Sequence, residues 1–303
     1  MLVFKLRNKA VGFEKRIIYE AKPIDPEEVR FPGELEKTEE DEKDIELALE
    51  ILEGYMKALG VEPSKKISLE SVHLFYERQF KKLSPYNREC IGLQDPEKSR
   101  IQAIKSHRRL ATVMTLVHEM VHELGIRKWE FNSNILGKKD KLYRTGYVLV
   151  SDEGEENGDG KDKFDAFNEG VVETIAYDAV MKQKENVTWK LKLDLEGFDK
   201  KAWKEVTYRD AVWLLDIIIK KLAQIDGKAG PEVFRTIAKG EFTGEMMWMR
   251  SIDRIFGPGS LRVLASLHPH PKKPEDIERN QKIIQYFKTE DPGEREKLQT
   301  DIY

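Results

Sequence analysis

Cysteine is nearly absent: Cys90 is the only one in 303 residues. A lone thiol cannot form a disulfide within the chain, so the sequence gives no sign of the oxidising compartments in which disulfides form. A free cysteine commonly behaves as a small apolar side chain of the core, and we interpret Cys90 in that way.

Long apolar runs are also missing. The most apolar stretch, residues 211–219, is far shorter than the roughly 20 residues that span a bilayer. Charged side chains interrupt residues 1–20 too often for the apolar region of a signal peptide. We therefore expect a soluble, cytoplasmic protein that does not bind membranes.

An excess of one charge is absent as well. The 52 Lys and Arg nearly balance the 55 Asp and Glu, for a net charge of −3, so no basic surface for nucleic acid is predicted. Hydrophobic residues make up 40% of the chain, which suffices for a real core. The length allows one large domain or two modest ones.

What the sequence does contain is the pattern H-E-x-x-H, formed by His118, Glu119 and His122. Positions i and i+4 share one face of a helix, so both imidazoles can point at one metal ion. Catalytic zinc takes three protein ligands and a water, whose pKa it lowers towards neutrality. The glutamate of such a motif accepts a proton from that water, which predicts Glu119 as a general base.

The alternative is a chance match within a buried helix. Apolar neighbours surround the motif and predict that this segment is buried: Leu116, Val117, Met120, Val121 and Leu124. Two histidines and a glutamate on a core helix would leave polar groups in need of partners, and a metal ion supplies such partners. We therefore favour the zinc site.

The third ligand is predicted in residues 167–178, where Glu169 and Glu173 share one face of a helix. Asn168 is expected to cap the start of this helix. Buried acids need partners, so a carboxylate pair that faces a core favours a role at the metal. Glu169 is then the third ligand, and Glu173 orients a zinc-bound histidine by a hydrogen bond.

The stretch H-E-M-V-H and the later N-E-G-V-V-E resemble the gluzincin metallopeptidases, which combine H-E-x-x-H with a downstream glutamate. The N-E-G form is similar to the aminopeptidase branch, and the E-x-x-x-acid form resembles thermolysin-like enzymes. In both branches the first glutamate of the second motif is the third ligand, which implies Glu169 here. The link between the motifs is longer than in either branch, and the aminopeptidase motif G-x-M-E-N has no counterpart. The resemblance therefore implies a Zn2+-dependent endopeptidase that acts on a peptide or protein substrate.

Two other zinc families share part of this pattern. The metzincin motif begins like residues 118–125, but Lys128 stands where a third histidine is expected, and an ammonium cannot ligate zinc. Peptide deformylases add an upstream cysteine, yet the residues around Cys90 do not reproduce their cysteine motif. A histidine of the stretch His268-Pro269-His270-Pro271 is the remaining alternative to Glu169.

A peptidase also needs a hydrogen-bond donor for the oxyanion of its tetrahedral intermediate. The sequence leaves several candidates open: Tyr143, Tyr147, Tyr177, Tyr208, His268 and His270. Tyr208 lies in the helical part of the chain where some gluzincins carry such a tyrosine, so we rank it first. The competing hypothesis is a zinc-bearing interaction domain without turnover, and the intact Glu119 argues against it.

Hydrophobic periodicity predicts an α+β fold with a small N-terminal sheet packed on the H-E-x-x-H helix and a mostly helical C-terminal lobe. The motif resemblance implies that this fold is zincin-like. Helices are expected at residues 38–59, from about 107 and at 167–178, and strands at 72–77, 100–104 and 142–150. Three units follow: strands or an arm at 1–33, an N-lobe at 34–165, and a helical C-lobe at 166–303 that carries the third ligand. The acidic loop at 152–165 departs from the EF-hand pattern, which predicts a solvated hairpin loop.

Within the C-lobe, helices are predicted at residues 208–225, 231–239, 244–256, 260–267 and 277–287. The cluster of residues 246–249, Met-Met-Trp-Met, is interpreted as a core patch rather than as a substrate pocket. The ending E-F-T-G followed by F-G-x-G-S-L-R is similar to that of poorly characterised bacterial zincin-like peptidases.

Overall fold

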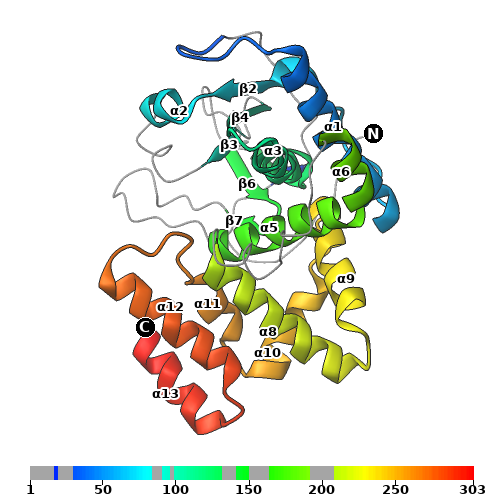
Figure 1. Ribbon diagram of the computed structural model, residues 1–303. Coiled ribbons are helices and arrows are strands. Elements are labelled where there is room, and N and C mark those ends of the chain that lie inside the picture. Colours follow the sequence, from blue (N-terminus) through cyan, green and yellow to red (C-terminus); the bar gives the residue numbers. More distant parts are fainter. Residues whose placement is uncertain are drawn as a thin grey trace.

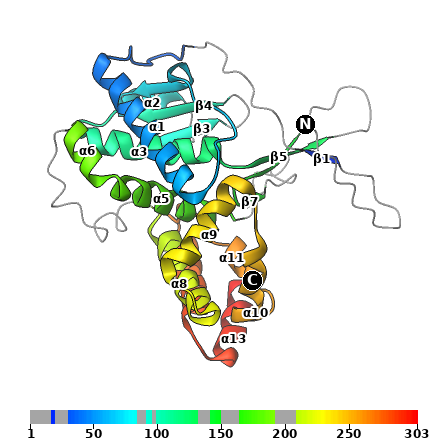
Figure 2. The same ribbon diagram turned by 90° about the vertical axis from the view of Figure 1, so that its right-hand side faces the viewer.

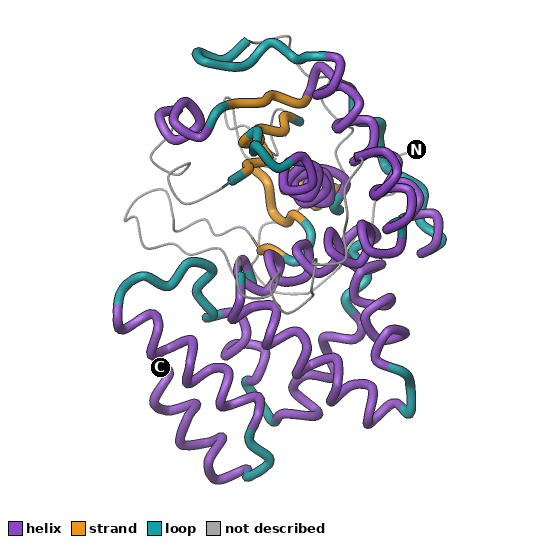
Figure 3. Tube along the Cα trace, in the orientation of Figure 1, coloured by secondary structure: helices purple, strands orange, loops and turns teal. Residues whose placement is uncertain are grey.

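The computed structural model describes residues 17–19, 30–83, 91–95, 99–131, 141–149, 164–191 and 208–303. These residues form a mixed α+β structure that is mostly helical, as the sequence predicts in outline. The strands lie in one half of the molecule, and the other half consists of helices (Figure 3). None of the helices in these ranges combines the length and the apolar composition that a bilayer span requires.

The first helix, α1 (Glu39–Leu59), begins and ends where local sequence signals place it. The Thr38 hydroxyl accepts a hydrogen bond from the Asp41 N–H at 3.2 Å, and the Asp41 carboxylate accepts one from the Thr38 N–H at 3.0 Å. This reciprocal pair satisfies N–H groups that a helix start leaves without partners. Gly60 ends the helix in the left-handed conformation, at φ 70°.

A three-stranded sheet contains β2 (Val72–Phe75), β3 (Gly92–Asp95) and β4 (Arg100–Ile104), in the order β2-β4-β3. β2 runs parallel to β4, and β3 runs antiparallel to it. All four residues of β2 are buried. A 3-10 turn, η1 (Leu69–Ser71), precedes the strand, and helix α2 (Glu77–Leu83) follows it and contacts it. Strands β2 and β4 are predicted from the sequence, but β3 is not, because Gly-Leu-Gln-Asp has little strand propensity.

A second, antiparallel sheet runs in the order β1-β5-β6-β7 and extends to one side of the molecule (Figure 2). Its strands are β1 (Ile17–Tyr19), β5 (Arg127–Phe131), β6 (Lys141–Thr145) and β7 (Val148–Leu149). The prediction of one strand at 142–150 is wrong, because Gly146 at φ 51° makes a turn that divides it. Apart from β1, residues 1–29 lie outside the described residues, and so does the acidic loop up to residue 163.

The central helix is α3 (Arg109–Leu124), which carries the H-E-x-x-H motif. The three-stranded sheet and α1 pack against it, and α5 (Asp165–Lys182) crosses below it (Figure 1). All the valines and leucines of α3 from Val113 onwards are buried. The polar side chains on the same helix must therefore find partners inside the protein.

The C-terminal half is a helical lobe, visible in the lower part of Figure 1. Its elements are α8 (Arg209–Asp226), α9 (Gly230–Thr243), η3 (Met247–Met249), α10 (Arg250–Phe256), α11 (Ser260–Ala265), α12 (Pro274–Lys288) and α13 (Pro292–Ile302). Helix α5 contacts α1 and α3 on one side and α8, α9 and α11 on the other. The boundary predicted between residues 165 and 166 therefore falls at the start of a helix that both halves share. A short helix, α6 (Lys184–Leu191), follows α5.

The structure corrects two of the predictions for this lobe. The helix predicted at 244–256 is a short 3-10 turn followed by α10. Met249 is 5% exposed and belongs to the core, but Met247 is 67% exposed, so the methionine cluster is a core patch only in part. The end of the chain is packed on the lobe, because α13 contacts α12 and buries Ile302.

Candidate metal and catalytic site

His118 and His122 lie one turn apart on α3, so their rings point the same way. Their Nε2 atoms are 3.2 Å apart. His118 is 7% exposed, and His122 is partly buried. Two basic ring nitrogens this close inside a protein need a proton or a cation between them.

Helix α5 brings Glu169 to the two histidines. One carboxylate oxygen lies 3.2 Å from Nε2 of His118, and the other lies 3.3 Å from Nε2 of His122. The crossing of α3 and α5 thus assembles the three residues that the sequence predicts as ligands, although they come from segments far apart in the chain.

This donor set fits a tetrahedral divalent cation. Ligand atoms about 2.0–2.1 Å from zinc are about 3.3 Å apart in tetrahedral geometry. The 3.2 Å between the two Nε2 atoms agrees with that value, and each of the two rings has one Glu169 oxygen within 3.2 or 3.3 Å. Two imidazoles and one carboxylate also leave a fourth position for water or substrate. His118, His122 and Glu169 can therefore hold a metal ion.

Glu173 contacts the other nitrogen of His118. Its Oε2 atom lies 2.8 Å from Nδ1 of that ring, and the residue is 3% exposed. A carboxylate at Nδ1 keeps the proton there and leaves Nε2 free to bind a metal. Glu173 thus lies one helical turn beyond Glu169 and contacts His118, and its orienting role stays a prediction.

The electrostatics of the cluster favour a bound positive charge. Burial disfavours the charged imidazole of His118, but hydrogen bonds to Glu169 and Glu173 raise its pKa well above the usual value. Burial also opposes ionisation of Glu169, but the charge of His122 and the hydrogen bond to His118 hold its pKa well below the usual range. The cluster therefore retains protons that a metal cation would displace.

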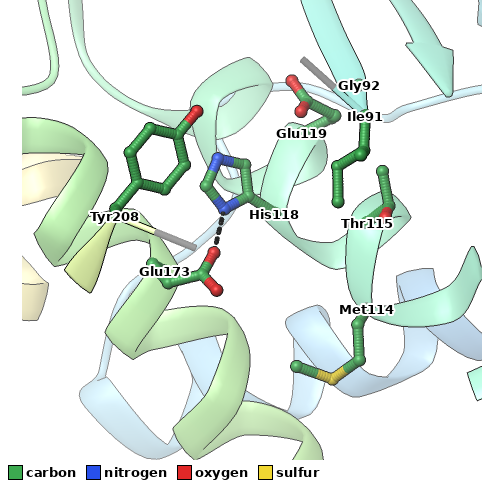
Figure 4. A pocket seen from close by; sticks show the side chains of 8 residues that line it. All are labelled: Ile91, Gly92, Met114, Thr115, His118, Glu119, Glu173 and Tyr208. Atoms are coloured by element: carbon green, nitrogen blue, oxygen red, sulfur yellow. Dashed lines mark hydrogen bonds and ion pairs between the residues drawn. The ribbon is translucent and has the colours of Figure 1, made fainter. Parts of the chain in front are cut away.

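Glu119 lies in a small pocket beside His118 (Figure 4). The pocket is lined by Ile91, Gly92, Met114, Thr115, His118, Glu119, Glu173 and Tyr208. Glu119 is 6% exposed, and burial raises its pKa above the usual value against the opposing charges of His118 and His122. A raised pKa suits a carboxylate that accepts protons near neutral pH.

Tyr208 closes another side of this pocket, immediately before α8. Its ring stacks on His118 with centroids 5.8 Å apart, and its hydroxyl points away from Glu173 towards the end of the pocket that holds Glu119 (Figure 4). The His270 ring packs on Tyr208 at a centroid distance of 5.0 Å. Tyr208 has φ 46°, a left-handed conformation that bulky residues rarely adopt and that is typical of functional sites.

Gly170 allows α8 to approach this closely. A Cβ atom on Gly170 would lie 2.9 Å from the backbone carbon of Ala211, in the first turn of α8. Because Tyr208 lies just before that turn, the glycine of the N-E-G stretch helps to place the tyrosine over His118.

The other oxyanion candidates lie elsewhere or are only adjacent. Tyr147 is in the core, where its hydroxyl donates to the Ile237 carbonyl at 2.7 Å. Tyr177 packs against the core without lining the pocket, and the side chain of Tyr143 is not described. His270 packs on Tyr208, and its main-chain N–H donates to Nδ1 of His268 at 3.1 Å. Neither histidine belongs to the group that could hold a metal ion.

The predicted capping role of Asn168 is wrong. Helix α5 begins at Asp165, so Asn168 lies inside its first turn and is 1% exposed. Its Oδ1 atom accepts the Tyr147 N–H at 2.8 Å, and its Nδ2 atom lies 3.5 Å from Nδ1 of His122. As for the rival ligand sets, Lys128 is on strand β5 beyond the end of α3, and Cys90 lies outside the described residues.

Two residues beside the site are not predicted from the sequence. Gly92, the first residue of β3, lies so close to Glu119 that a Cβ atom on it would be 2.4 Å from Oε1. Glu241 of α9 is 1% exposed, and burial raises its pKa to about 7 against the opposing charges of His122 and Arg144. Neither residue stands at a fixed spacing from the H-E-x-x-H motif. The only sequence signal for Glu241 is that it is an acidic residue next to Phe242 in an amphipathic helix.

Comparison of this chain with protein-family models, with curated proteins and with solved structures gives no match. Its function is therefore inferred from its own residues and their geometry.

Proposed function

We propose that this protein is a zinc-dependent peptidase of the zincin type, in which Glu119 is the general base. The observation that carries this proposal is the place of Glu119, buried in the same pocket as the ligand His118. A structural zinc is usually closed by a fourth protein ligand and needs no base beside it. A three-residue ligand set with an adjacent carboxylate is what hydrolysis requires.

His118, His122 and Glu169 are the residues that hold the metal, and zinc is the ion that this ligand set suits best. When bound, zinc supplies a Lewis acid that lowers the pKa of water towards neutrality and polarises a carbonyl group. Glu173 keeps the proton on Nδ1 of His118 and so holds the ring in its ligating tautomer.

The remaining steps belong to Glu119 and Tyr208. Glu119 accepts a proton from the attacking water and returns it to the nitrogen of the leaving amine, so that the reaction balances. The Tyr208 hydroxyl donates a hydrogen bond to the carbonyl oxygen as negative charge develops there. His270 supports Tyr208 by packing on its ring.

An extended peptide is the substrate class that the surroundings favour. Strand β3 is at the edge of its sheet, with β4 as its only neighbour among the described strands. Ile91 and Gly92, at the start of β3, line the pocket that holds Glu119. Edge strands accept extended chains by main-chain hydrogen bonds along their length, which suits the middle of a polypeptide and therefore an endopeptidase.

Replacement of the base tests this proposal. We expect Glu119→Gln to abolish peptide hydrolysis while the protein still binds about one zinc per chain, because Glu119 is not a ligand. Exposed Glu53 on α1 offers the matched control, Glu53→Gln, which should keep full activity. A Glu119→Gln protein that cleaves at the rate of the parent would refute the mechanism.

A catalytically silent zinc domain is the competing function. Incubation of the zinc-loaded protein with a mixed peptide library, followed by mass spectrometry of the products, separates the two. The peptidase proposal predicts defined cleavage products that disappear with Glu119→Gln. Intact peptides in the presence of bound zinc would favour the silent domain.

A further inference from the structure

Glu241 is a buried carboxylate for which the proposed chemistry has no role. It lies near the end of α9, a helix that packs against α5, and is 1% exposed. Its Oε1 atom is so close to Gly125 and Gly146 that Cβ atoms on those glycines would be 2.9 and 2.1 Å away. Its main-chain carbonyl accepts the Ile126 N–H at 3.0 Å, which ties α9 to the end of α3.

The hydrogen bonding of this carboxylate is incomplete. Among the described residues, Oε2 of Glu241 has no hydrogen-bond partner. An unsatisfied buried carboxylate costs stability, and an apolar side chain of the same length would avoid that cost. Such local conflicts are typical of positions that serve a function.

His122, on α3, lacks the carboxylate acceptor that His118 has at Nδ1. Nδ1 of His118 faces a carboxylate, Glu173, at 2.8 Å. Nδ1 of His122 instead faces the Nδ2 atom of Asn168 at 3.5 Å. When Nε2 of a histidine binds a cation, Nδ1 carries the proton and needs an acceptor, but an amide NH2 can only donate.

The acceptor atom of Asn168 is engaged elsewhere. Oδ1 of Asn168 accepts the Tyr147 N–H at 2.8 Å. A Cβ atom built on Gly146, the residue before Tyr147, would lie 2.1 Å from Oε1 of Glu241 and 2.6 Å from Oδ1 of Asn168. The Tyr147 N–H is therefore within reach of both acceptors, the amide oxygen and the Glu241 carboxylate.

We propose that Glu241 is a positioning residue for His122 and acts through Asn168. On metal binding, the Glu241 carboxylate accepts the Tyr147 N–H in place of Asn168. The Asn168 amide then turns over, and its Oδ1 atom accepts the Nδ1 proton of His122. This inference rests on the metal site of the proposed function but does not depend on peptide hydrolysis.

Two substitutions of Glu241 test the proposal in a chelator competition for zinc. Glu241→Met has the same length and no acceptor, so zinc affinity should fall about 10-fold, the lower end of the range for partners of ligand histidines. Glu241→Gln keeps an oxygen for the Tyr147 N–H, so its zinc affinity should stay close to that of the parent. In the metal-free state, Glu241→Met should melt at or above the temperature of the parent, because an unsatisfied carboxylate is gone. Parent-like zinc affinity in a folded Glu241→Met protein would overturn the proposal.

The link through Asn168 is tested by a double-mutant cycle. If Glu241 acts through Asn168, then Glu241→Met should cause no further loss of zinc affinity once Asn168 is alanine. Losses that add in the double variant would exclude this route. Because zinc affinity is measured without substrate, a protein that binds zinc but cleaves nothing refutes the peptidase alone.

Nuclear magnetic resonance gives a second readout should Glu241→Met fail to fold. In the parent protein, the side-chain amide signals of Asn168 should shift between the metal-free and zinc-loaded states, because the amide turns over. Unchanged signals on zinc loading would overturn the proposal.

Discussion

Glu169 and Glu173 lie four residues apart on α5, yet they contact different nitrogens of the same histidine. Glu169 is 3.2 Å from Nε2 of His118, and Glu173 is 2.8 Å from Nδ1. Because only one imidazole nitrogen can ligate the metal, the two carboxylates have different roles. Residue identity alone does not separate these roles; position relative to the ring does.

The two glutamates should therefore differ in their effect on zinc. We expect Glu173→Ala to weaken zinc affinity by about 10- to 100-fold, because the ring loses its orienting acceptor. Glu169→Ala should remove nearly all of the metal, because a ligand is lost. Glu173→Gln, which keeps an acceptor oxygen, serves as the control in the chelator competition. If Glu173→Ala alone loses the metal, the third ligand is Glu173 instead.

The close approach of Gly92 to Glu119 leads to a second prediction at the residue scale. A Cβ atom there would lie 2.4 Å from Oε1 of Glu119, so alanine must displace the carboxylate that we propose as the general base. We expect Gly92→Ala to lower the rate of peptide hydrolysis about 100-fold or more, in line with the cost of small misplacements in active sites. Zinc content should not change, because the three atoms that the new Cβ would meet first all belong to Glu119, which is not among the predicted ligands.

The matched control for this experiment is Gly293→Ala, whose new Cβ atom would meet only ordinary contact, 3.5 Å from Asp291. Parallel measurements of activity and zinc content on both variants decide the point. A Gly92→Ala protein that hydrolyses peptides at the rate of the parent would contradict this prediction.

At the scale of elements, α1 shows how a helix end couples structure to pH. Asp41 closes the capping box with Thr38 and also pairs with Lys105 at 2.7 Å. Burial by itself raises the pKa of Asp41, but the hydrogen bonds from Lys105 and Thr38 bring it below the usual value. The helix start that packs beside α3 is therefore stabilised by an ionised carboxylate.

The sign of the pH effect follows from the lowered pKa. A carboxyl group with a lower pKa in the folded than in the unfolded state binds fewer protons when folded. Its contribution is complete above the unfolded value of about 4 and is lost as the pH falls through the folded value. We expect the free energy of unfolding in urea to fall below about pH 4, and to fall less in Asp41→Asn than in the parent. Asp226→Asn, at an exposed position on α8, should keep the pH dependence of the parent. If the free energy of unfolding falls equally with pH in all three proteins, this account is contradicted.

For the molecule as a whole, the candidate metal site joins two helices on which much of the packing depends. Its ligands come from α3 and α5, and α5 contacts helices of both halves. A cation held by residues of both helices binds the folded chain and not the unfolded one, so it stabilises the fold by mass action.

Zinc should therefore raise the unfolding temperature. At a free concentration about 1,000 times the dissociation constant, a ligand adds about 4 kcal/mol to the free energy of unfolding. Calorimetric melts with zinc and with a chelator should differ for the parent protein. Glu169→Ala, which lacks a ligand, should melt at the same temperature under both conditions; an identical melt of the parent with and without zinc would exclude the site.

Local signals account for the elements that the sequence predicts correctly. Thr38, Asp41 and Gly60 bound α1 because caps act within a few residues. The i,i+4 spacing of His118 with His122, and of Glu169 with Glu173, is likewise a local property of helices. Strand β3 is missed because its pairing with β4, and not its own composition, makes it a strand. The single strand at 142–150 is predicted wrongly because a positive φ at Gly146 turns the chain.

The sequence alone determined the residue types of a group that could hold a metal ion and the helices that carry them. Only the tertiary structure decided which nitrogen of His118 each glutamate contacts, and that Asn168 bonds Tyr147 instead of capping α5. It also decided that Gly92, Tyr208 and Glu241 lie beside the motif. The physical reason is range: capping and helical spacing act within a turn or two of chain, whereas contacts between separate helices depend on how their surfaces pack.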